Sequence, residues 1–91
     1  MQRERRARRT RHFIVVSVPA TTGRSRLGLT VSSKVGGAVR RNRVKRRVRE
    51  IFRKHRKKLQ PAQDLLIIAR AGADMLSYRE IEAELRNLLV P

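Results

Sequence analysis

The sequence contains no cysteine and only two histidines, His12 and His55. Disulfide bonds and thiolate metal sites are therefore excluded, and two separate histidines cannot supply the usual ligands of a zinc ion. Acidic residues are also scarce, at 7 Asp and Glu against 24 Lys and Arg. They form no cluster of the kind that holds two metal ions for phosphodiester hydrolysis. The sequence thus predicts no metal site and no catalytic residue in this chain.

Long hydrophobic runs are absent as well. The longest, residues 13–18 and 65–69, are far too short to cross a bilayer. The basic beginning of the chain also lacks the apolar stretch of a secretory signal. We therefore expect a cytoplasmic protein that does not contact membranes. The aromatic residues are two Phe and one Tyr, so few side chains are available to stack on bases.

Positive charge is what the sequence has in excess. The net charge is +17 over 91 residues, and it divides into +19 for residues 1–58 and −2 for residues 59–91. A surface that binds a polyanion is therefore expected in the first two thirds of the chain. At 40% hydrophobic residues, the chain still has enough apolar content to fold as one small domain.

The clearest helical pattern covers residues 38–58. Its apolar side is formed by positions three or four residues apart, namely Val44, Val48, Ile51, Phe52, His55 and Leu59. We interpret His55 on this stripe as a packed core imidazole rather than an acid or base. Residues 40–58 also contain twelve Lys or Arg but one acid, Glu50. Solvated helix faces usually mix both signs, so this pattern indicates nucleic-acid binding.

Three segments, residues 12–18, 26–33 and 64–70, have the composition of β-strands. In the first, Phe13 and Val15 share one face. The second alternates apolar with small polar residues, and its small polar face either meets solvent or carries an extended nucleic-acid strand. The short connection between these two segments favours an antiparallel arrangement. The third is a continuous apolar run, which is typical of a central strand.

Both ends of the chain have simple patterns. Ser77 and Glu80 fit a capping box, which predicts a final helix. The core positions expected on that helix are Tyr78, Ile81, Leu85, Leu88 and Leu89. Residues 1–11 carry six arginines and one acid without a helical stripe. We expect a flexible basic arm over residues 1–11 that contacts phosphates without sequence preference, followed by a single domain over residues 12–91.

The segment from Gly37 to Arg53, which includes Arg41-Asn42-Arg43, resembles the signature of the bacterial ribonuclease P protein component. The match extends through residues 26–34 and 64–70 to the final helix. The resemblance implies an α+β fold with a small sheet and a C-terminal helix, similar to the second domain of ribosomal protein S5. It also implies a left-handed strand–helix–strand crossover around the Arg-rich helix, although general rules favour the right-handed form.

The resemblance further implies a subunit of the ribonucleoprotein that removes the 5′ leader of precursor tRNA. Catalysis would belong to the RNA, which would also bind most of the Mg²⁺. The positions it assigns to RNA binding are Arg41, Asn42, Arg43, Lys45, Arg46, Arg49 and Arg53. The positions assigned to a leader-binding cleft are Phe13, Val15, Ser33 and Lys34. Family members usually wall this cleft with aromatic residues of a further N-terminal helix, which residues 1–11 do not match.

The expected partners are ribonuclease P RNA and precursor tRNA, with no obligate protein partner. Two other functions remain open. A structural RNA-binding protein of the ribosomal kind would share the charge and size but would have no role in tRNA processing. A helix-turn-helix DNA-binding protein is disfavoured, because the basic helix lies between strands and has no short helix before it.

Overall fold

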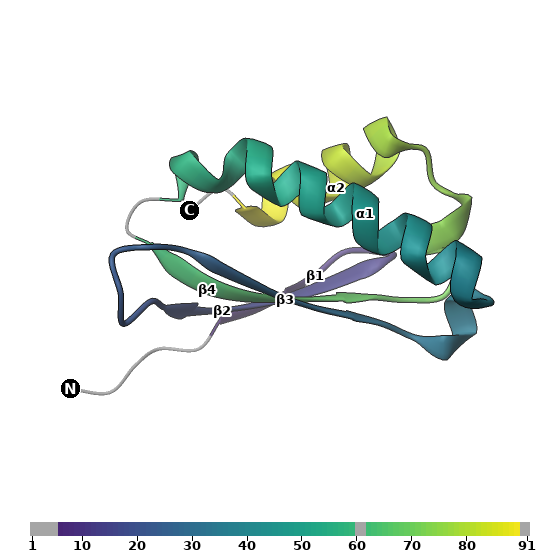
Figure 1. Cartoon of the computed structure of the whole chain (residues 1–91), viewed down its shortest axis with the longest axis horizontal. Helices are drawn as coiled ribbons and strands as arrows, with labels where there is room; N and C mark the ends of the chain where they lie inside the picture. Colours follow the sequence, from purple (N-terminus) through teal and green to yellow (C-terminus); the bar gives the residue numbers. More distant parts are fainter. Residues whose placement is uncertain (1–5, 60–61, 90–91) are drawn as a thin grey trace.

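Two helices lie on one face of a four-stranded sheet, and within the part of the chain that the structure describes no helix covers the other face (Figure 1). The computed structural model describes residues 6–59 and 62–89. The elements in chain order are β1 (Arg6–Arg9), β2 (Phe13–Pro19), β3 (Arg26–Val31), α1 (Ala38–His55), β4 (Gln63–Ala69) and α2 (Tyr78–Leu89). Short 3-10 turns at Ser33–Val35, Arg56–Lys58 and Ala73–Met75 connect them. Within these residues, neither helix has the length and apolar character needed to span a membrane.

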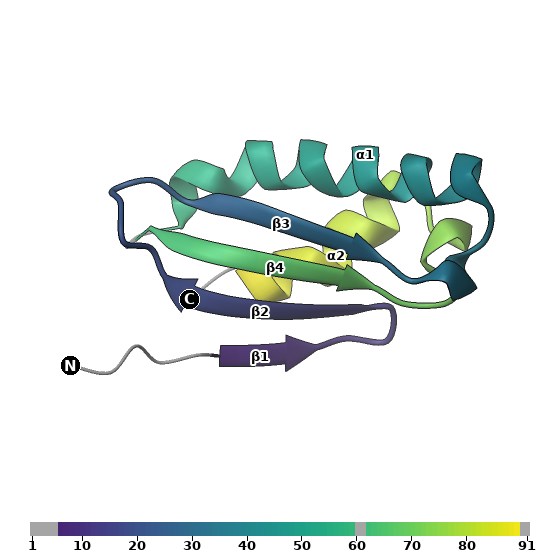
Figure 2. The ribbon, with the colours of Figure 1, turned by 60° about the horizontal axis from the view of Figure 1, so that its bottom comes forward.

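The sheet has the strand order β1-β2-β4-β3. β4 is central, as its apolar run predicted, and pairs antiparallel with β2 and parallel with β3. β2 and β3 therefore run in opposite directions, as expected, but are not neighbours, because β4 lies between them. The connection β3–α1–β4 is a left-handed crossover: seen from the open face with both strands pointing right, β4 lies below β3 and α1 lies behind them (Figure 2). The crossover thus has the hand that the family resemblance implied.

The core lies between the sheet and the helices. The predicted stripe of α1 is confirmed, since Val44, Val48 and Ile51 have no exposed surface and His55 is 9% exposed. These side chains pack against the face of the sheet that carries Phe13, Val15, Val31, Leu65, Ile67 and Ala69. α2 contributes Ile81 and Leu85, as predicted, and Tyr78 packs beside them. The side chains of Leu88 and Leu89 lie outside the described residues.

The ends of the two helices follow local chemistry. Gly36, just before α1, has φ of +141°, and a Cβ there would lie 2.8 Å from Cδ of Arg40. Only glycine fits this backbone. The predicted capping box at α2 is present: Glu80 N donates to Ser77 Oγ at 3.2 Å, and Ser77 N donates to Glu80 Oε1 at 3.0 Å. The hydrogen bond from the Ser77 backbone lowers the pKa of Glu80.

The prediction of a flexible arm over residues 1–11 is wrong for Arg6–Arg9. These residues form β1, which pairs antiparallel with β2 from Arg6 opposite Ser17 to Arg9 opposite Ile14. An edge strand is held by backbone hydrogen bonds to one neighbour and needs no apolar stripe, and its charged side chains discourage pairing with another sheet. The charged composition of these residues therefore predicted a flexible arm, although they form a strand. Residues 1–5 lie outside the described residues.

Ile51→Ala should lower the free energy of unfolding by about 2–5 kcal/mol, because it leaves a cavity under the centre of α1. Val39→Ala provides the control, since Val39 lies on the same helix and is 74% exposed. It should change the free energy by less than about 0.5 kcal/mol. Urea unfolding followed by circular dichroism measures both. Equal losses for the two variants would contradict the assignment of the stripe.

Candidate nucleic-acid interface

Three basic residues of α1 hold the helix against the C-terminal part of the chain. Arg47 Nη1 donates to the carbonyl of Leu76 at 2.7 Å. Lys54 Nζ lies 3.0 Å from Glu82 Oε2, and Arg40 Nη1 lies 3.5 Å from Asp74 Oδ2. All three occupy the flank of α1 that faces α2 and the turn before it. These contacts join α1 to the C-terminal segment, although the side chains of Arg40 and Lys54 stay 63% and 60% exposed.

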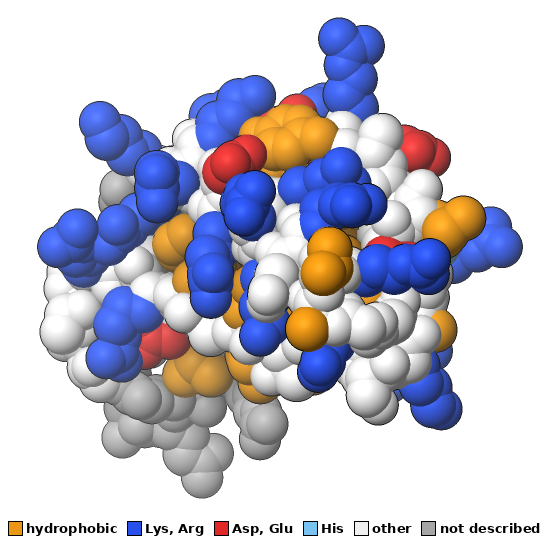
Figure 3. All heavy atoms as spheres, turned by 45° about the vertical axis from the view of Figure 1, so that its right-hand side comes forward, with side chains coloured by type: hydrophobic (Ala, Val, Ile, Leu, Met, Phe, Trp, Pro, Cys, Tyr) orange, Lys and Arg blue, Asp and Glu red, His pale blue; other side chains and the backbone are white. Residues whose placement is uncertain are grey.

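The seven predicted RNA-binding residues lie elsewhere on α1. Asn42, Arg43, Arg46, Arg49 and Arg53 are exposed, and Arg41 and Lys45 are half-buried. Within residues 6–59 and 62–89, no hydrogen bond or ion pair engages these seven side chains. Figure 3 views the side on which α1 begins and shows many protruding Lys and Arg side chains with few carboxylates between them. This surface can bind an anion without first breaking internal ion pairs.

A shallow hollow lies at the N-terminal half of this surface. It has a volume of about 330 Å³ and is lined by Val39, Asn42, Arg43 and Arg46. Two guanidinium groups can each hold a phosphate through paired hydrogen bonds, and Asn42 adds a donor and an acceptor. Val39 gives the hollow an apolar edge against which a sugar or base can pack. The combination suits a folded polynucleotide better than a free anion.

Arg41 differs from the other residues of this surface. Its Nε atom is buried and has no hydrogen-bond partner among the described residues. An unpaired buried N–H costs about 1–3 kcal/mol. A partner that accepts a hydrogen bond from this atom would remove that cost, which makes Arg41 a candidate contact residue.

The assignment of Phe13 and Val15 to a leader-binding cleft is wrong. Phe13 is 0% and Val15 2% exposed, and both lie beneath the helices. Successive side chains of a strand point to opposite faces, so the alternation that puts these residues together puts them in the core. Such residues cannot contact RNA in this fold.

The other two predicted cleft residues, Ser33 and Lys34, are exposed in the turn after β3. Lys34 borders a hollow of about 360 Å³ that is also lined by Ser32, Ile68, Ala69, Arg70 and Ala71. Ile68 and Arg70 were missed by sequence reasoning. Ile68 lies opposite Thr30 because β4 pairs with β3 in this register. The sequence of neither strand alone indicates that register.

Comparison with known proteins places this geometry in a family. The family described as Ribonuclease P matches residues 1–90. The chain is 42% identical over 88 residues to the ribonuclease P protein component of Desulforapulum autotrophicum, covering 97% of this chain and 75% of that protein. For the same component of Syntrophus aciditrophicus the identity is 40% over 80 residues, covering 88% and 67%. The chain belongs to the ribonuclease P protein family.

Solved structures of ribonuclease P proteins share the fold. The protein from Thermotoga maritima superposes with a TM-score of 0.84 at 32% identity, covering 94% of this chain and 82% of that one. The protein from Staphylococcus aureus gives a TM-score of 0.84 at 34% identity, covering 93% and 78%. The α+β fold implied by the sequence resemblance is thereby confirmed.

In this member of the ribonuclease P protein family, both histidines have structural partners. His12 Nδ1 lies 2.9 Å from Glu84 Oε2, and its backbone N–H donates to Glu84 Oε1 at 2.9 Å. Burial alone would raise the pKa of Glu84, but hydrogen bonds from Thr10 and His12 outweigh it and lower the pKa. His55 Nε2 lies 3.3 Å from Glu82 Oε2. Over the residues for which the structure gives positions, no three His, Asp or Glu side chains could together hold a metal ion.

Replacing Arg46 and Arg49 by Ala should weaken binding to ribonuclease P RNA and lower the salt dependence of that binding. Each phosphate contact contributes about 0.7–0.9 to the slope of log K against log salt concentration, so the double variant should lose about 1–2 units. Filter binding from about 50 to 200 mM salt measures the slope. Arg79→Ala with Arg86→Ala, both exposed on α2, removes the same charge elsewhere. An unchanged slope for the α1 variant would remove this face from the interface.

Glu82→Gln should destabilise the protein at neutral pH, and the difference from wild type should shrink in acid. The hydrogen bond from Lys54 lowers the pKa of Glu82 below its ordinary 4.5. A carboxylate with a lowered pKa stabilises the folded state above its unfolded-state pKa and loses this contribution as the pH falls through the folded-state pKa. Melting temperatures of both proteins at pH 7 and pH 3 test this. A difference independent of pH would show that Glu82 does not act as a charged partner.

Proposed function

We propose that the chain is the protein subunit of ribonuclease P, which binds the catalytic RNA through α1 and assists removal of the 5′ leader of precursor tRNA. The observation that carries the proposal is the exposed cationic surface of α1, whose side chains have no internal partners among the described residues. Because three other cations anchor the helix, this surface is presented rigidly. Rigid presentation reduces the entropy lost on binding and favours one defined RNA geometry over loose charge attraction.

The RNA would hold the Mg²⁺ ions of the reaction. Magnesium prefers oxygen ligands and usually keeps several of its waters. Of the carboxylates outside α1, Asp64, Asp74, Glu82 and Glu84 pair with basic side chains or histidine, and Glu80 caps α2. These five acids are thus engaged in contacts within the fold. Cations on α1 would instead reduce repulsion between RNA phosphates that approach one another around the metal ions.

The single-stranded leader would cross the open end of the sheet beside the turn that follows β3. Support comes from the hollow bordered by Lys34, Ile68 and Arg70. Lys34 and Arg70 can contact two phosphates, and Ile68 can pack against a base or sugar. This site replaces the buried Phe13 and Val15. It keeps Lys34 at its edge, and Ser33 lies beside the hollow between its lining residues Ser32 and Lys34. The protein would act in the cytoplasm without an obligate protein partner.

Leader cleavage of a precursor tRNA by a bacterial ribonuclease P RNA at low magnesium, with and without this protein, tests the proposal. The protein should stimulate cleavage strongly, because its cations replace part of the counterion requirement. The effect should grow with leader length. No stimulation would favour a structural RNA-binding role instead.

Lys34→Ala with Arg70→Ala should raise KM on the order of a hundredfold for a precursor with a long leader, because each of the two lost phosphate contacts accounts for about a factor of ten. A precursor with a single leader nucleotide should show little change. The α2 variant with Arg79→Ala and Arg86→Ala serves as the charge control. Equal effects on both precursors would remove this hollow from the leader path while leaving the function itself intact.

A further inference from the structure

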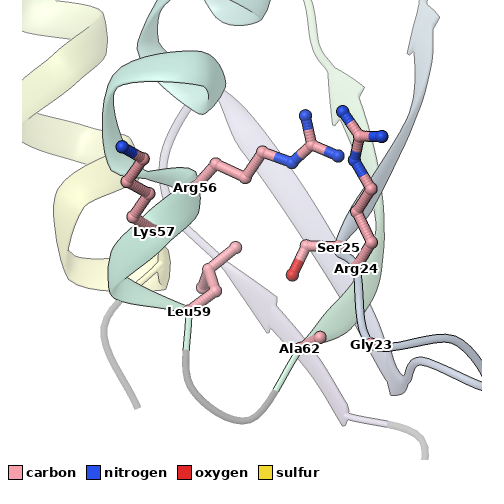
Figure 4. Close-up of a pocket in the computed structure, with 7 residues that line it drawn as sticks. All are labelled: Gly23, Arg24, Ser25, Arg56, Lys57, Leu59 and Ala62. Carbon is pink, nitrogen blue, oxygen red and sulfur yellow. The ribbon is translucent and has the colours of Figure 1, made fainter.

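A second basic hollow lies at the far end of α1, away from the Arg41-Asn42-Arg43 segment. It has a volume of about 320 Å³, and its lining residues are Gly23, Arg24, Ser25, Arg56, Lys57, Leu59 and Ala62 (Figure 4). At 1.5 Å per residue, Arg56 lies about 20 Å along the helix from Arg43. A single phosphate cannot contact both places. This hollow is thus separate from the one lined by Val39, Asn42, Arg43 and Arg46, and it lies just beyond Arg53 at the end of the cationic surface.

Two guanidinium groups meet at this hollow from segments distant in sequence. Arg24 comes from the loop between β2 and β3, and Arg56 follows the last turn of α1. In Figure 4 the two guanidinium groups extend toward each other. No carboxylate is among the lining residues. Neither side chain forms a hydrogen bond or ion pair with another residue that the structure describes. Like charges brought together repel, and an anion between them removes that repulsion.

The surrounding structure holds both arginines in position. Ser25, which is 4% exposed, accepts a hydrogen bond from Gln63 N at 2.9 Å. The backbone N–H of Ala20 donates to the carbonyl of Ala62 at 3.0 Å. These contacts attach both ends of the loop to the start of β4. On the other side Leu59, 3% exposed, anchors the turn that carries Arg56. The hollow is therefore formed before any ligand arrives.

The helix dipole opposes an anion here, because α1 ends at this hollow and its C-terminus carries about half a negative charge. Residues 53–58 outweigh it, since five of the six are Lys or Arg. A guanidinium pair also matches the two non-bridging oxygens of a backbone phosphate through paired hydrogen bonds, whereas a chloride ion offers a single acceptor atom.

We propose that Arg24 and Arg56 together clamp one backbone phosphate of an RNA, as a second anchor at the opposite end of α1. The proposal rests on the proposed function for the identity of the RNA, which is either the catalytic RNA or the precursor tRNA. Two anchors about 20 Å apart would fix the direction of α1 along the RNA, whereas a single anchor would leave it free to pivot.

The test compares Arg24→Gln, Arg56→Gln and the double variant with wild type. Each single variant should weaken binding about tenfold, the loss expected for a charge-assisted hydrogen bond. The double variant should lose little more, because both arginines serve the same phosphate. The control, Arg79→Gln with Arg86→Gln, removes the same charge from α2. Arg56→Lys keeps the charge but not the paired donors, so it should restore only part of the affinity. All variants should melt near the wild-type temperature, since neither arginine has a described partner.

Two assays separate the sources of the phosphate. Weaker binding to ribonuclease P RNA alone assigns it to the catalytic RNA. Unchanged binding to that RNA with a raised KM for precursor tRNA assigns it to the substrate. If the double variant matches the α2 control in both assays while wild type stimulates cleavage, the clamp is wrong and the proposed function stands. Additive losses would also overturn the shared clamp. If wild type neither binds the RNA nor stimulates cleavage, the proposed function fails and the clamp fails with it.

Discussion

The burial of one apolar stripe keeps a strongly cationic helix folded. Like charges three or four residues apart on α1 repel by about 0.2–0.5 kcal/mol per pair. Each fully buried Val or Ile of the stripe contributes about 1.5–3 kcal/mol, so Val44, Val48 and Ile51 together outweigh several repulsive pairs. The sheet thus provides the apolar surface against which the charged helix packs. Without it, the charged segment would be an extended polycation.

The few acids of the chain have a complementary task. Asp74, Glu82 and Glu84 each meet a basic residue or a histidine from an earlier part of the sequence. Negative charge is thereby used to join the C-terminal segment to α1 and β2. On α1 itself the one acid is Glu50. The basic part of the sequence therefore supplies the surface that RNA would approach, and the slightly acidic part supplies contacts that hold the domain together.

Elements that depend on the spacing of their own residues could be predicted from the sequence. Features that depend on a neighbouring strand or on a segment distant in the chain could not. The stripe of α1 and the capping box at Ser77 follow from local spacing, and both were found as predicted. β1 was not predicted, because an edge strand is held by hydrogen bonds to the backbone of its neighbour and needs no apolar pattern of its own. The assignment of Phe13 to the leader-binding cleft was wrong for a related reason. The alternation of side chains along a strand shows that Phe13 and Val15 lie on the same face of the sheet, but it does not show which face the helices cover. The hollow between Arg24 and Arg56 joins residues 32 positions apart, and only the fold brings them together.

The central position of β4 also determines when the protein can fold. β4 pairs with both β2 and β3, yet it follows α1 in the chain. During synthesis, which proceeds at about 5–20 residues per second, residues 1–58 leave the ribosome with a charge of +19 and no sheet to support them. The eleven residues 59–69 follow within about 0.5–2 s at that rate, and until then this segment is a nascent polycation beside ribosomal RNA. The chain order thus makes the arrival of residues 63–69 the step that converts nonspecific affinity for RNA into a shaped surface.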